Sequence, residues 1–337
     1  MPDMKVSVVV PVRDEENSIR ELLDSLLTQT RPPDEIVITD GGSTDATPQI
    51  IEEYIRKGAP VRLIRAGAAL PGRGRNLGAA QASNEWLAFT DAGIRLENNW
   101  LEALVAKAET DDHIDVVYGT CQPVTDTFFK QCAALAYVPP PTPHDGVITR
   151  PRFIASTLLR REVWQAVNGF PEELRSAEDL IFMDRVENAG YRFVFEPRAQ
   201  VHWDLRPTFW STFKRFVVYS RNNIRAGLFW QWQATVLFKY YGVLAALLAA
   251  VLIFKPSLVW FPIAAWLFLL AARAAVAIRR NRFCYPASFL QNVMRGAMIM
   301  PLIAVLDAAA IIGTIQWLLL DCFRWSRKTP VEAGNGA

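Results

Sequence analysis

Alternating apolar and polar stretches divide the first hundred residues of the chain into strand-like and helix-like segments. A continuous apolar run is found at 6–12 (VSVVVPV), and three further strand-like segments follow at 35–40 (EIVITD), 61–66 (VRLIRA) and 85–91 (EWLAFTD). Such runs are typical of strands that are buried on both faces of a parallel sheet. We therefore predict four strands in this part of the chain.

Apolar residues with helical spacing separate these strands. Asn17 is placed to cap a helix after the first strand, and apolar positions then recur every three or four residues. After the second strand, Thr47 and Pro48 are placed to begin another helix, which runs through Tyr54. The alternation of strands and helices predicts an α/β fold with a mostly parallel sheet and right-handed crossovers.

Polar residues follow three of the predicted strands directly. These residues are Arg13-Asp14-Glu15, then Asp40-Gly41-Gly42, and finally Asp91. In sheets of this kind, ligands bind beyond the carboxyl ends of the strands. An acid there can accept hydrogen bonds from a base or a ribose, and glycines let the backbone approach a ligand closely. We expect a binding site at this edge, although a plain turn with a helix cap also explains DGGSTD when that motif is taken alone.

A glycine-rich segment, GRGRNLG at 72–78, precedes the fourth strand. We expect it to form a loop in front of a helix, where its two arginines, its asparagine and its backbone amides suit a diphosphate. Residues 111–151 are less regular, and the proline-rich stretch 137–147 is predicted to be a surface loop on the acceptor side. Helices are expected at 161–167 and 176–190, followed by a strand that begins near 192.

The last third of the chain is much more apolar than the rest. Three long apolar stretches occur at 236–254, 258–272 and 298–320. Each is close to the length of about 20 residues that a membrane-spanning helix needs. Buried core helices are the alternative, but three such runs would leave a soluble domain with little polar surface.

Aromatic residues and arginines alternate just before this apolar region. Phe209, Phe213 and Phe216 share a helical face, with Lys214 and Arg215 interspersed. This pattern suits the headgroup layer of a membrane, and it also fits a helix that packs against the sheet. We predict four parts: a domain at 1–207, an amphipathic interfacial linker at 208–233, a transmembrane region of about three helices at 234–322, and a tail at 323–337.

Composition narrows the classes of function that remain. The formal net charge of +2 over 337 residues provides no basic field for nucleic acid, so we expect no nucleic-acid partner. No secretory signal is visible at the N-terminus, which favours a cytoplasmic location for the soluble part. The four cysteines are scattered without metal-like spacing and indicate free thiols in a reducing compartment.

The order of the motifs is more specific than any one of them. VVVPVRDEENSIRELLDSL, EIVITDGGSTDAT, GRGRNLGAA, WLAFTDAG and SAEDLIFMDRVENAGY together resemble the family 2 glycosyltransferases of GT-A fold, from about Lys5 to His202. The resemblance implies a nucleotide-diphosphate sugar as the donor. The donor-binding residues that it implies are Pro11, Arg13, Glu15, Asp40, Gly42, Arg75, Asn76 and Asp91.

The same resemblance implies the chemistry. Asp179, in the sequence AED, matches the catalytic base that takes the proton of the acceptor hydroxyl, and Glu178 beside it is expected to orient the acceptor or the helix. Without the other motifs, two acids in the first turn of an amphipathic helix would need no such role. A Mg²⁺ or Mn²⁺ ion would offset the charge on the leaving nucleoside diphosphate.

The metal motif of this sequence departs from the family pattern. Asp91 matches the first acid of Asp-x-Asp, but Gly93 stands where the second acid is expected. Mg²⁺ needs few protein ligands when diphosphate oxygens and waters supply the others. We therefore expect weak or donor-dependent metal binding. His202 is a candidate further ligand, although a lone histidine is more often a structural partner.

These observations lead to one main hypothesis and two alternatives. The main hypothesis is inverting transfer of a single sugar to a lipid or lipid-linked acceptor. The Gln-x-x-Arg-Trp motif of processive synthases is absent after the predicted base, which favours single transfer over chain synthesis. A nucleotidyltransferase would need a glycine-rich first loop with a lysine, which PVRDEEN does not provide. A degenerate, non-catalytic membrane scaffold that binds nucleotide-sugars is supported by Gly93 alone.

Charge also predicts a topology. The domain at 1–207 should face the cytoplasm at the cell inner membrane, because arginines flank the first span and again follow the second, at 273–282. Three full spans would place the tail outside, yet that tail contains Arg324, Arg327 and Lys328. We expect three full spans. A re-entrant third segment, broken near Pro301 and carrying Asp307, is the alternative.

Overall fold

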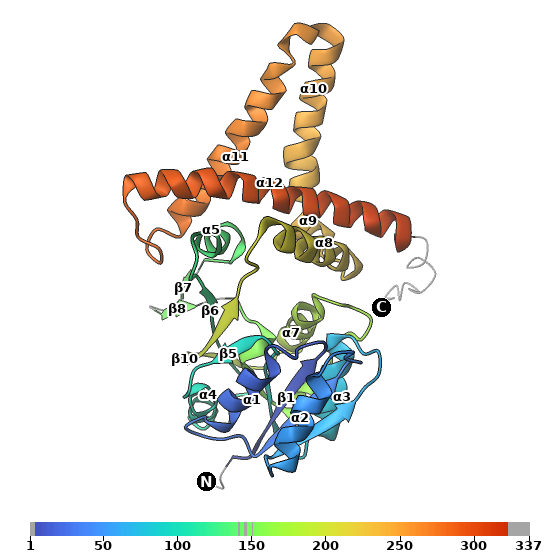
Figure 1. Ribbon diagram of the computed structural model, residues 1–337, viewed down its shortest axis with the longest axis vertical. Helices are drawn as coiled ribbons and strands as arrows, with labels where there is room; N and C mark the ends of the chain where they lie inside the picture. Colours follow the sequence, from blue (N-terminus) through green and yellow to red (C-terminus); the bar gives the residue numbers. More distant parts are fainter. Residues whose placement is uncertain (1–3, 141, 145–146, 150, 323–337) are drawn as a thin grey trace, which may run out of the picture. The chain divides into compact units, whose positions relative to one another are not determined.

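The computed structural model describes residues 4–140, 142–144, 147–149 and 151–322, and it gives the side chains outside 141–150 (Figure 1). The predicted tail at 323–337 lies outside the described residues. The chain divides into two compact units, Met1–Thr125 with Pro139–Leu205, and Asp126–Val138 with Arg206–Ala337. The division at Leu205 lies two residues from the boundary predicted at 207.

An eight-stranded mixed sheet forms the centre of the first unit. Its order is β3-β2-β1-β4-β9-β6-β10-β5, in which β3-β2, β2-β1, β1-β4 and β6-β10 are parallel neighbours. The strands are β1 (Val6–Val12), β2 (Glu35–Asp40), β3 (Val61–Arg65), β4 (Trp86–Phe89), β5 (Ile94–Leu96), β6 (Val116–Val124), β9 (Thr157–Arg160) and β10 (Phe193–Asp204). All four strands predicted in the first hundred residues are therefore confirmed.

Helices cover both faces of this sheet. They are α1 (Ile19–Leu27), α2 (Thr47–Arg56), α3 (Pro71–Gln81), α4 (Trp100–Ala108), α6 (Arg161–Ala166) and α7 (Glu178–Asn188), with the 3-10 turn η1 (Ile154–Ser156). Alternate residues of β1 point to opposite faces of the sheet. Val8 and Val10 pack with α1, α2 and α4. Val9 packs with α3, α6 and α7. Burial on both faces is the reason that β1 is apolar throughout.

Three local predictions are wrong. Helix α1 begins at Ile19, so that Ser18 and not Asn17 is the residue before it. The glycine-rich segment is helix α3 and not a loop, because Pro71 begins the helix and its glycines allow close packing. The proline-rich stretch after residue 137 is not loop throughout, because β7 (Thr142–His144) and β8 (Val147–Thr149) form an antiparallel pair.

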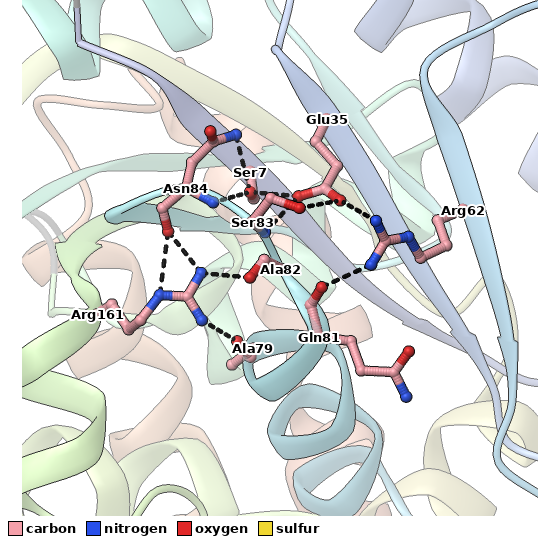
Figure 2. Close-up of polar contacts among 9 residues, drawn as sticks. All are labelled: Ser7, Glu35, Arg62, Ala79, Gln81, Ala82, Ser83, Asn84 and Arg161. Atoms are coloured by element: carbon pink, nitrogen blue, oxygen red, sulfur yellow. Dashed lines mark hydrogen bonds and ion pairs between the residues drawn. The ribbon is translucent and has the colours of Figure 1, made fainter.

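Arg161 fixes the carboxyl end of α3 (Figure 2). Its guanidinium donates to the backbone carbonyls of Ala79, Ala82 and Asn84, at 2.7, 2.6 and 3.1 Å. Beside it, Glu35 accepts from the Ser7 hydroxyl and from the backbone amide of Ser83, both at 2.7 Å. Carbonyls at the end of a helix have no partner within the helix, and Arg161 supplies one.

The second unit consists of helices. They are α5 (Phe128–Tyr137), α8 (Phe209–Arg225), α9 (Phe229–Ala234), the π-helical segment η2 (Thr235–Gly242), α10 (Val243–Phe254), the 3-10 turn η3 (Pro256–Leu258), α11 (Trp260–Arg280) and α12 (Phe289–Leu320). Three helical stretches of the described chain are long and apolar enough to cross a membrane: Phe229–Phe254, Pro256–Arg280 and Phe289–Leu320. The break near Pro301, which was the alternative to three full spans, is not present, because α12 continues through this residue as one helix.

Replacing Arg161 with Met should lower the free energy of unfolding by about 2–4 kcal/mol, since three carbonyls lose a charged donor. Thermal unfolding of the detergent-solubilised protein measures the change. Arg56→Met is the matched control, because Arg56 is exposed on the last turn of α2; this change should cost less than about 0.5 kcal/mol. Equal losses in the two variants would contradict the capping role of Arg161.

Candidate active site

The predicted polar residues lie at the carboxyl ends of the first two strands. Asp40 ends β2 with 4% of its surface exposed, and it accepts a hydrogen bond from the backbone amide of Ser43 at 3.0 Å. Pro11 lies beside Thr39 in the β1–β2 pairing. Arg13 is exposed and pairs with Asp14 at 3.6 Å. These residues form the rim of the edge at which ligands bind in parallel sheets.

The glycine pair after Asp40 has a structural reason as well as a functional one. A Cβ on Gly41 would lie 2.7 Å from the carbonyl oxygen of Ala69, and one on Gly42 would lie 2.9 Å from that of Gly67. Gly42 also has a φ of +84°, which other residues rarely adopt. The glycines therefore let two loops pass closely at this edge, whether or not they contact a donor.

Helix α3 brings Arg75 into the interior. A Cβ on Gly74 would lie 3.0 Å from the Pro11 side chain, and one on Gly78 would lie 2.5 Å from Val9, so α3 packs almost directly on β1. Arg75 is 3% exposed. Its guanidinium donates to Asp91 Oδ1 at 2.6 Å and to Glu178 Oε1 at 2.7 Å. One buried cation thus joins the end of β4 to the start of α7.

The Arg75 guanidinium also lies over an aromatic ring. Its central carbon is 5.5 Å from the centre of the Phe170 ring. Phe170 in turn stacks on Phe182, with 3.9 Å between the two ring centres. Burial alone would lower the pKa of Arg75, but the charges of Asp91, Glu178 and Asp179 raise it above its usual value. Arg75 therefore stays charged at every pH at which the protein folds.

Asp179 lies in the first turn of α7, next to the Arg75 ion pairs. The residue before the helix, Ala177, has a φ of +69°, a left-handed conformation that turns the chain sharply into α7. Burial, with the negative charge of Glu178, raises the pKa of Asp179 to about 6. A carboxylate with a pKa near 6 is mostly deprotonated at neutral pH and accepts protons better than an ordinary aspartate does.

Asn76 contacts the protein with its whole amide group. Its Nδ2 donates to the Phe170 carbonyl at 2.9 Å and to Glu172 at 3.0 Å. Its Oδ1 accepts from the Trp164 indole at 3.1 Å and from the Phe170 amide at 2.9 Å. These contacts hold the segment that precedes α7, so Asn76 acts on the site through this segment.

The backbone conformation at position 93 explains why this residue is a glycine. Its φ is +77°, and a Cβ at this position would lie 3.9 Å from Glu15 Oε2. An acid at position 93 would therefore bring a second carboxylate close to that of Glu15 in a backbone conformation that favours glycine. Glu15 itself accepts from the Ser18 hydroxyl and is only partly buried. The carboxylate nearest to position 93, where the second acid of Asp-x-Asp is absent, is thus that of Glu15 in the loop after β1.

His202 already has a protein partner. It lies in β10 opposite Arg95 of β5, and its Nε2 is 2.5 Å from Glu97 Oε1. Among the described residues, no group of three or more His, Cys, Asp or Glu side chains is arranged to hold a metal ion. The donor set therefore fits a divalent ion only where Asp91 acts with ligands from the substrate and from water.

The ion pairs that join Arg75 to Asp91 and Glu178 were not predicted from the sequence. The two acids lie 16 and 103 residues from Arg75 in the chain, and no local pattern connects them. Glu178 Oε2 is also buried, and within the described residues it has no hydrogen-bond partner.

Comparison with known families gives two matches. Residues 7–167 match the family model described as Glycosyl transferase family 2, and residues 151–278 match the one described as Glycosyl transferase family group 2. The first match contains Asp40, Arg75 and Asp91, and the second contains Glu178 and Asp179. The second match also extends from the mixed sheet into the apolar helices.

Two curated relatives are similar over slightly more than half of the chain. The chain is 29% identical over 194 residues to the uncharacterized glycosyltransferase EpsJ of Bacillus subtilis (strain 168), covering 52% of this chain and 54% of EpsJ. It is 32% identical over 214 residues to the poly(ribitol-phosphate) beta-N-acetylglucosaminyltransferase TarS of Staphylococcus aureus (strain MW2), covering 58% of this chain and 35% of TarS. The chain thus spans about half or less of the length of these relatives.

Solved structures share the fold. The mannosyltransferase PcManGT from Pyrobaculum calidifontis, in complex with GDP-Man and Mn²⁺, aligns with a TM-score of 0.55 at 19% identity, covering 93% of this chain and 87% of that one. The crystal structure of S. aureus TarS aligns with a TM-score of 0.51 at 20% identity, covering 91% and 55%. The predicted α/β fold of GT-A type with C-terminal apolar helices is confirmed.

Replacing Arg75 with Met should destabilise the first unit by about 3–5 kcal/mol, because it leaves two buried carboxylates without their cation. Thermal unfolding measures this loss. Arg73→Met is the matched control, since Arg73 is exposed on the same helix. The double variant Arg75→Met with Glu178→Gln should recover part of the loss. If Arg75→Met melts like Arg73→Met, the ion pairs do not stabilise the fold.

Proposed function

The chain contains a glycosyltransferase family 2 domain of GT-A fold, and on this premise we propose that the protein is an inverting glycosyltransferase. It transfers a single sugar from a nucleotide-diphosphate donor to a lipid or lipid-linked acceptor at a membrane surface. The observation that carries this proposal is the position of Asp179. This acid, with a raised pKa, begins a helix that Arg75 connects to the strand-end acid Asp91.

Inversion needs one displacement at the anomeric carbon. The oxygen of the acceptor hydroxyl forms the new bond while the bond to the nucleoside diphosphate breaks, and the hydroxyl proton passes to the Asp179 carboxylate. A base with a pKa of about 6 is suited to this step at neutral pH. Glu178 cannot share this role while its Oε1 is bound to Arg75, so we assign it to positioning.

The donor would lie across the strand ends. Asp40 is placed to meet the base or ribose of the nucleotide, with Pro11, Arg13, Glu15 and Gly42 at the same edge. Arg75 supports donor binding indirectly, because it holds Asp91 in place. TarS and PcManGT are named for transferring sugars, and the solved complex of PcManGT contains GDP-Man.

A divalent ion, Mg²⁺ or Mn²⁺, would be held by Asp91 together with oxygens of the donor diphosphate. When bound, it would offset the negative charge that the leaving diphosphate gains. Asp91 would then share its carboxylate between the ion and Arg75, so binding should be weak in the absence of donor. His202 would need to leave Glu97 before it could serve as a ligand, and we assign it a structural role.

The apolar helices of the second unit are the reason that we propose a lipid or lipid-linked acceptor. Three of them are long enough to cross a membrane, and exposed aromatic residues such as Trp210 and Trp230 precede the apolar stretch. Aromatic side chains of this kind favour the layer between water and lipid. A catalytic unit attached to such helices works next to a lipid surface, and nucleotide-sugars are made in the cytoplasm. We therefore place the first unit on the cytoplasmic face.

Asp179→Asn should lower kcat by about a hundredfold or more while donor binding changes little, because the base is lost and the nucleotide site is kept. For the unchanged protein, kcat/KM should fall about tenfold per pH unit below about pH 6 and level off above it, as Asp179 loses its proton. The assay is nucleotide release from UDP-, GDP- and dTDP-sugars by purified membranes. Donor-dependent thermal stabilisation is the binding readout. Near-normal turnover of Asp179→Asn would refute the assignment.

Asp91→Ala should remove metal stimulation of transfer, because it deletes the one acid of the strand-end motif. It should also abolish donor-dependent Mn²⁺ binding, which can be measured by electron paramagnetic resonance without any turnover. Asp112→Ala is the control, since Asp112 is an exposed acid in the loop after α4. Donor-dependent Mn²⁺ binding that survives in Asp91→Ala would show that the ion is held elsewhere or that the protein uses none.

A further inference from the structure

Helix α12 is longer than a membrane-spanning helix needs to be. It contains 32 residues, which corresponds to a length of about 48 Å. The hydrocarbon core of a bilayer is about 30 Å thick. Length alone therefore does not show whether α12 crosses the bilayer or lies along its surface. The contacts of α12 show which arrangement the second unit favours.

The first half of α12 rests on α5. Cys132 and Leu135 of α5 form a buried cluster with Ile299 and Ile303 of α12. Helix α5 belongs to a segment of 13 residues, Asp126–Val138, whose two ends continue directly into the first unit. Crossing a bilayer takes about 20 residues in each direction. This segment is too short to cross and return, so α5 stays on the same side of the membrane as the first unit.

The second half of α12 rests on α8. Gly313 is packed so closely that a Cβ would lie 2.6 Å from the Ser220 side chain and 2.8 Å from the Val217 carbonyl oxygen. Near the end of α12, Asp321 accepts from Arg221 of α8 at 2.6 and 2.9 Å. These contacts are at two different positions along α12, Gly313 and Asp321, so α8 packs beside the second half of α12.

Helix α8 cannot enter the hydrocarbon layer. Its exposed residues include Lys214 and Arg215, and charges at the centre of a bilayer are costly. A capping box at Thr208 begins α8 four residues after β10 ends at Asp204, so the helix starts next to the first unit in the chain. Both helices beneath α12 are therefore confined to one face of the membrane.

Helices α10 and α11 behave differently. They form a hairpin that extends away from α12, which lies across its base (Figure 1). Most side chains of the hairpin beyond the base are exposed and apolar, including Leu252, Phe254, Phe261 and Phe268. Arg273 of α11 donates to Asp307 of α12 at 2.5 and 3.0 Å, and the hydroxyl of Tyr241 donates to the same acid at 3.2 Å. This buried ion pair fixes the crossing point of the hairpin and α12.

We propose that α12 lies in the plane of the membrane on the face of the first unit, and that the α10–α11 hairpin alone crosses the bilayer. The lipid-facing side of α12 is a stripe of exposed apolar residues at helical spacing: Leu290, Val293, Met294, Ala297, Pro301, Ala308, Ile312, Ile315 and Leu319. The opposite side rests on α5 and α8. The second unit thus has an apolar helix face that would contact lipid on the side of the membrane that holds the first unit.

This arrangement removes the conflict in the charge pattern. Three spans would send Arg324, Arg327 and Lys328 to the outside, against the preference of cationic residues for the cytoplasm. With α12 in the membrane plane, both of its ends stay on the same face, so the chain continues past Leu320 on the cytoplasmic side. The arginines at 279, 280 and 282 lie on that side too.

Native cysteines near the two ends of α12 provide the test. Cys284 is exposed before the helix, and Cys322 follows it. Variants with Cys121→Ser and either Cys322→Ser or Cys284→Ser keep one reporter each. Cys132 can stay, because it is buried and burial raises the pKa of its thiol to about 11. The triple variant without Cys121, Cys284 and Cys322 gives the background, and Ser257→Cys in that variant reports the hairpin tip.

A membrane-impermeant maleimide is applied to right-side-out and to inside-out vesicles, with detergent-permeabilised vesicles for the total. Cys284 and Cys322 should both be labelled in inside-out vesicles only, and Ser257→Cys in right-side-out vesicles only. Labelling of Cys284 and Cys322 from opposite faces would overturn the in-plane placement of α12. Labelling of all three from one face would overturn the crossing of the hairpin. The labelling needs no enzyme activity. Its outcome therefore tests the placement of α12 independently of the proposed transfer reaction.

Discussion

The buried guanidinium of Arg75 is the contact on which the first unit depends. It joins the middle of α3, the end of β4 and the start of α7, and no other described cation pairs with both Asp91 and Glu178. The glycines of α3 follow from this need, because only a helix without bulky side chains packs closely enough on β1 to bring Arg75 to both acids. Burial raises the pKa of Asp179, and the negative charge of Glu178, which Arg75 holds one residue earlier, raises it further.

Much of this could be predicted from the sequence, because the relevant signals are local. Short apolar segments predicted the first four strands, and the acids Asp40 and Asp91 near the ends of β2 and β4 indicated the edge of the site. The motif AED placed Asp179 at the start of a helix, where the structure has it. These features depend on a few neighbouring residues, and their physical causes can be read from those residues directly.

The rest depends on contacts between distant parts of the chain. The glycine-rich segment was expected to be a loop, since glycine disfavours helices, but packing against β1 outweighs that propensity. Asn76 was expected to face the donor, whereas its amide holds residues 164–172 through contacts that no local pattern indicates. The proposed orientation of α12 in the membrane plane could not be predicted either. Hydropathy measures how apolar a helix is, and it does not show that α5 and α8 pack against it.

The insertion of α5 between β6 and the later strands also determines an order of events during synthesis. The buried cluster around Cys132 and Leu135 of α5 is completed by residues that are made much later: Leu270 and Ala274 follow Leu135 by roughly 135 residues, and Ile299 and Ile303 by roughly 160. A ribosome adds 160 residues in about 10–30 seconds. The first unit can therefore begin to fold while this cluster is still incomplete. The final packing of α5 is then a late step, which waits for the synthesis of α12.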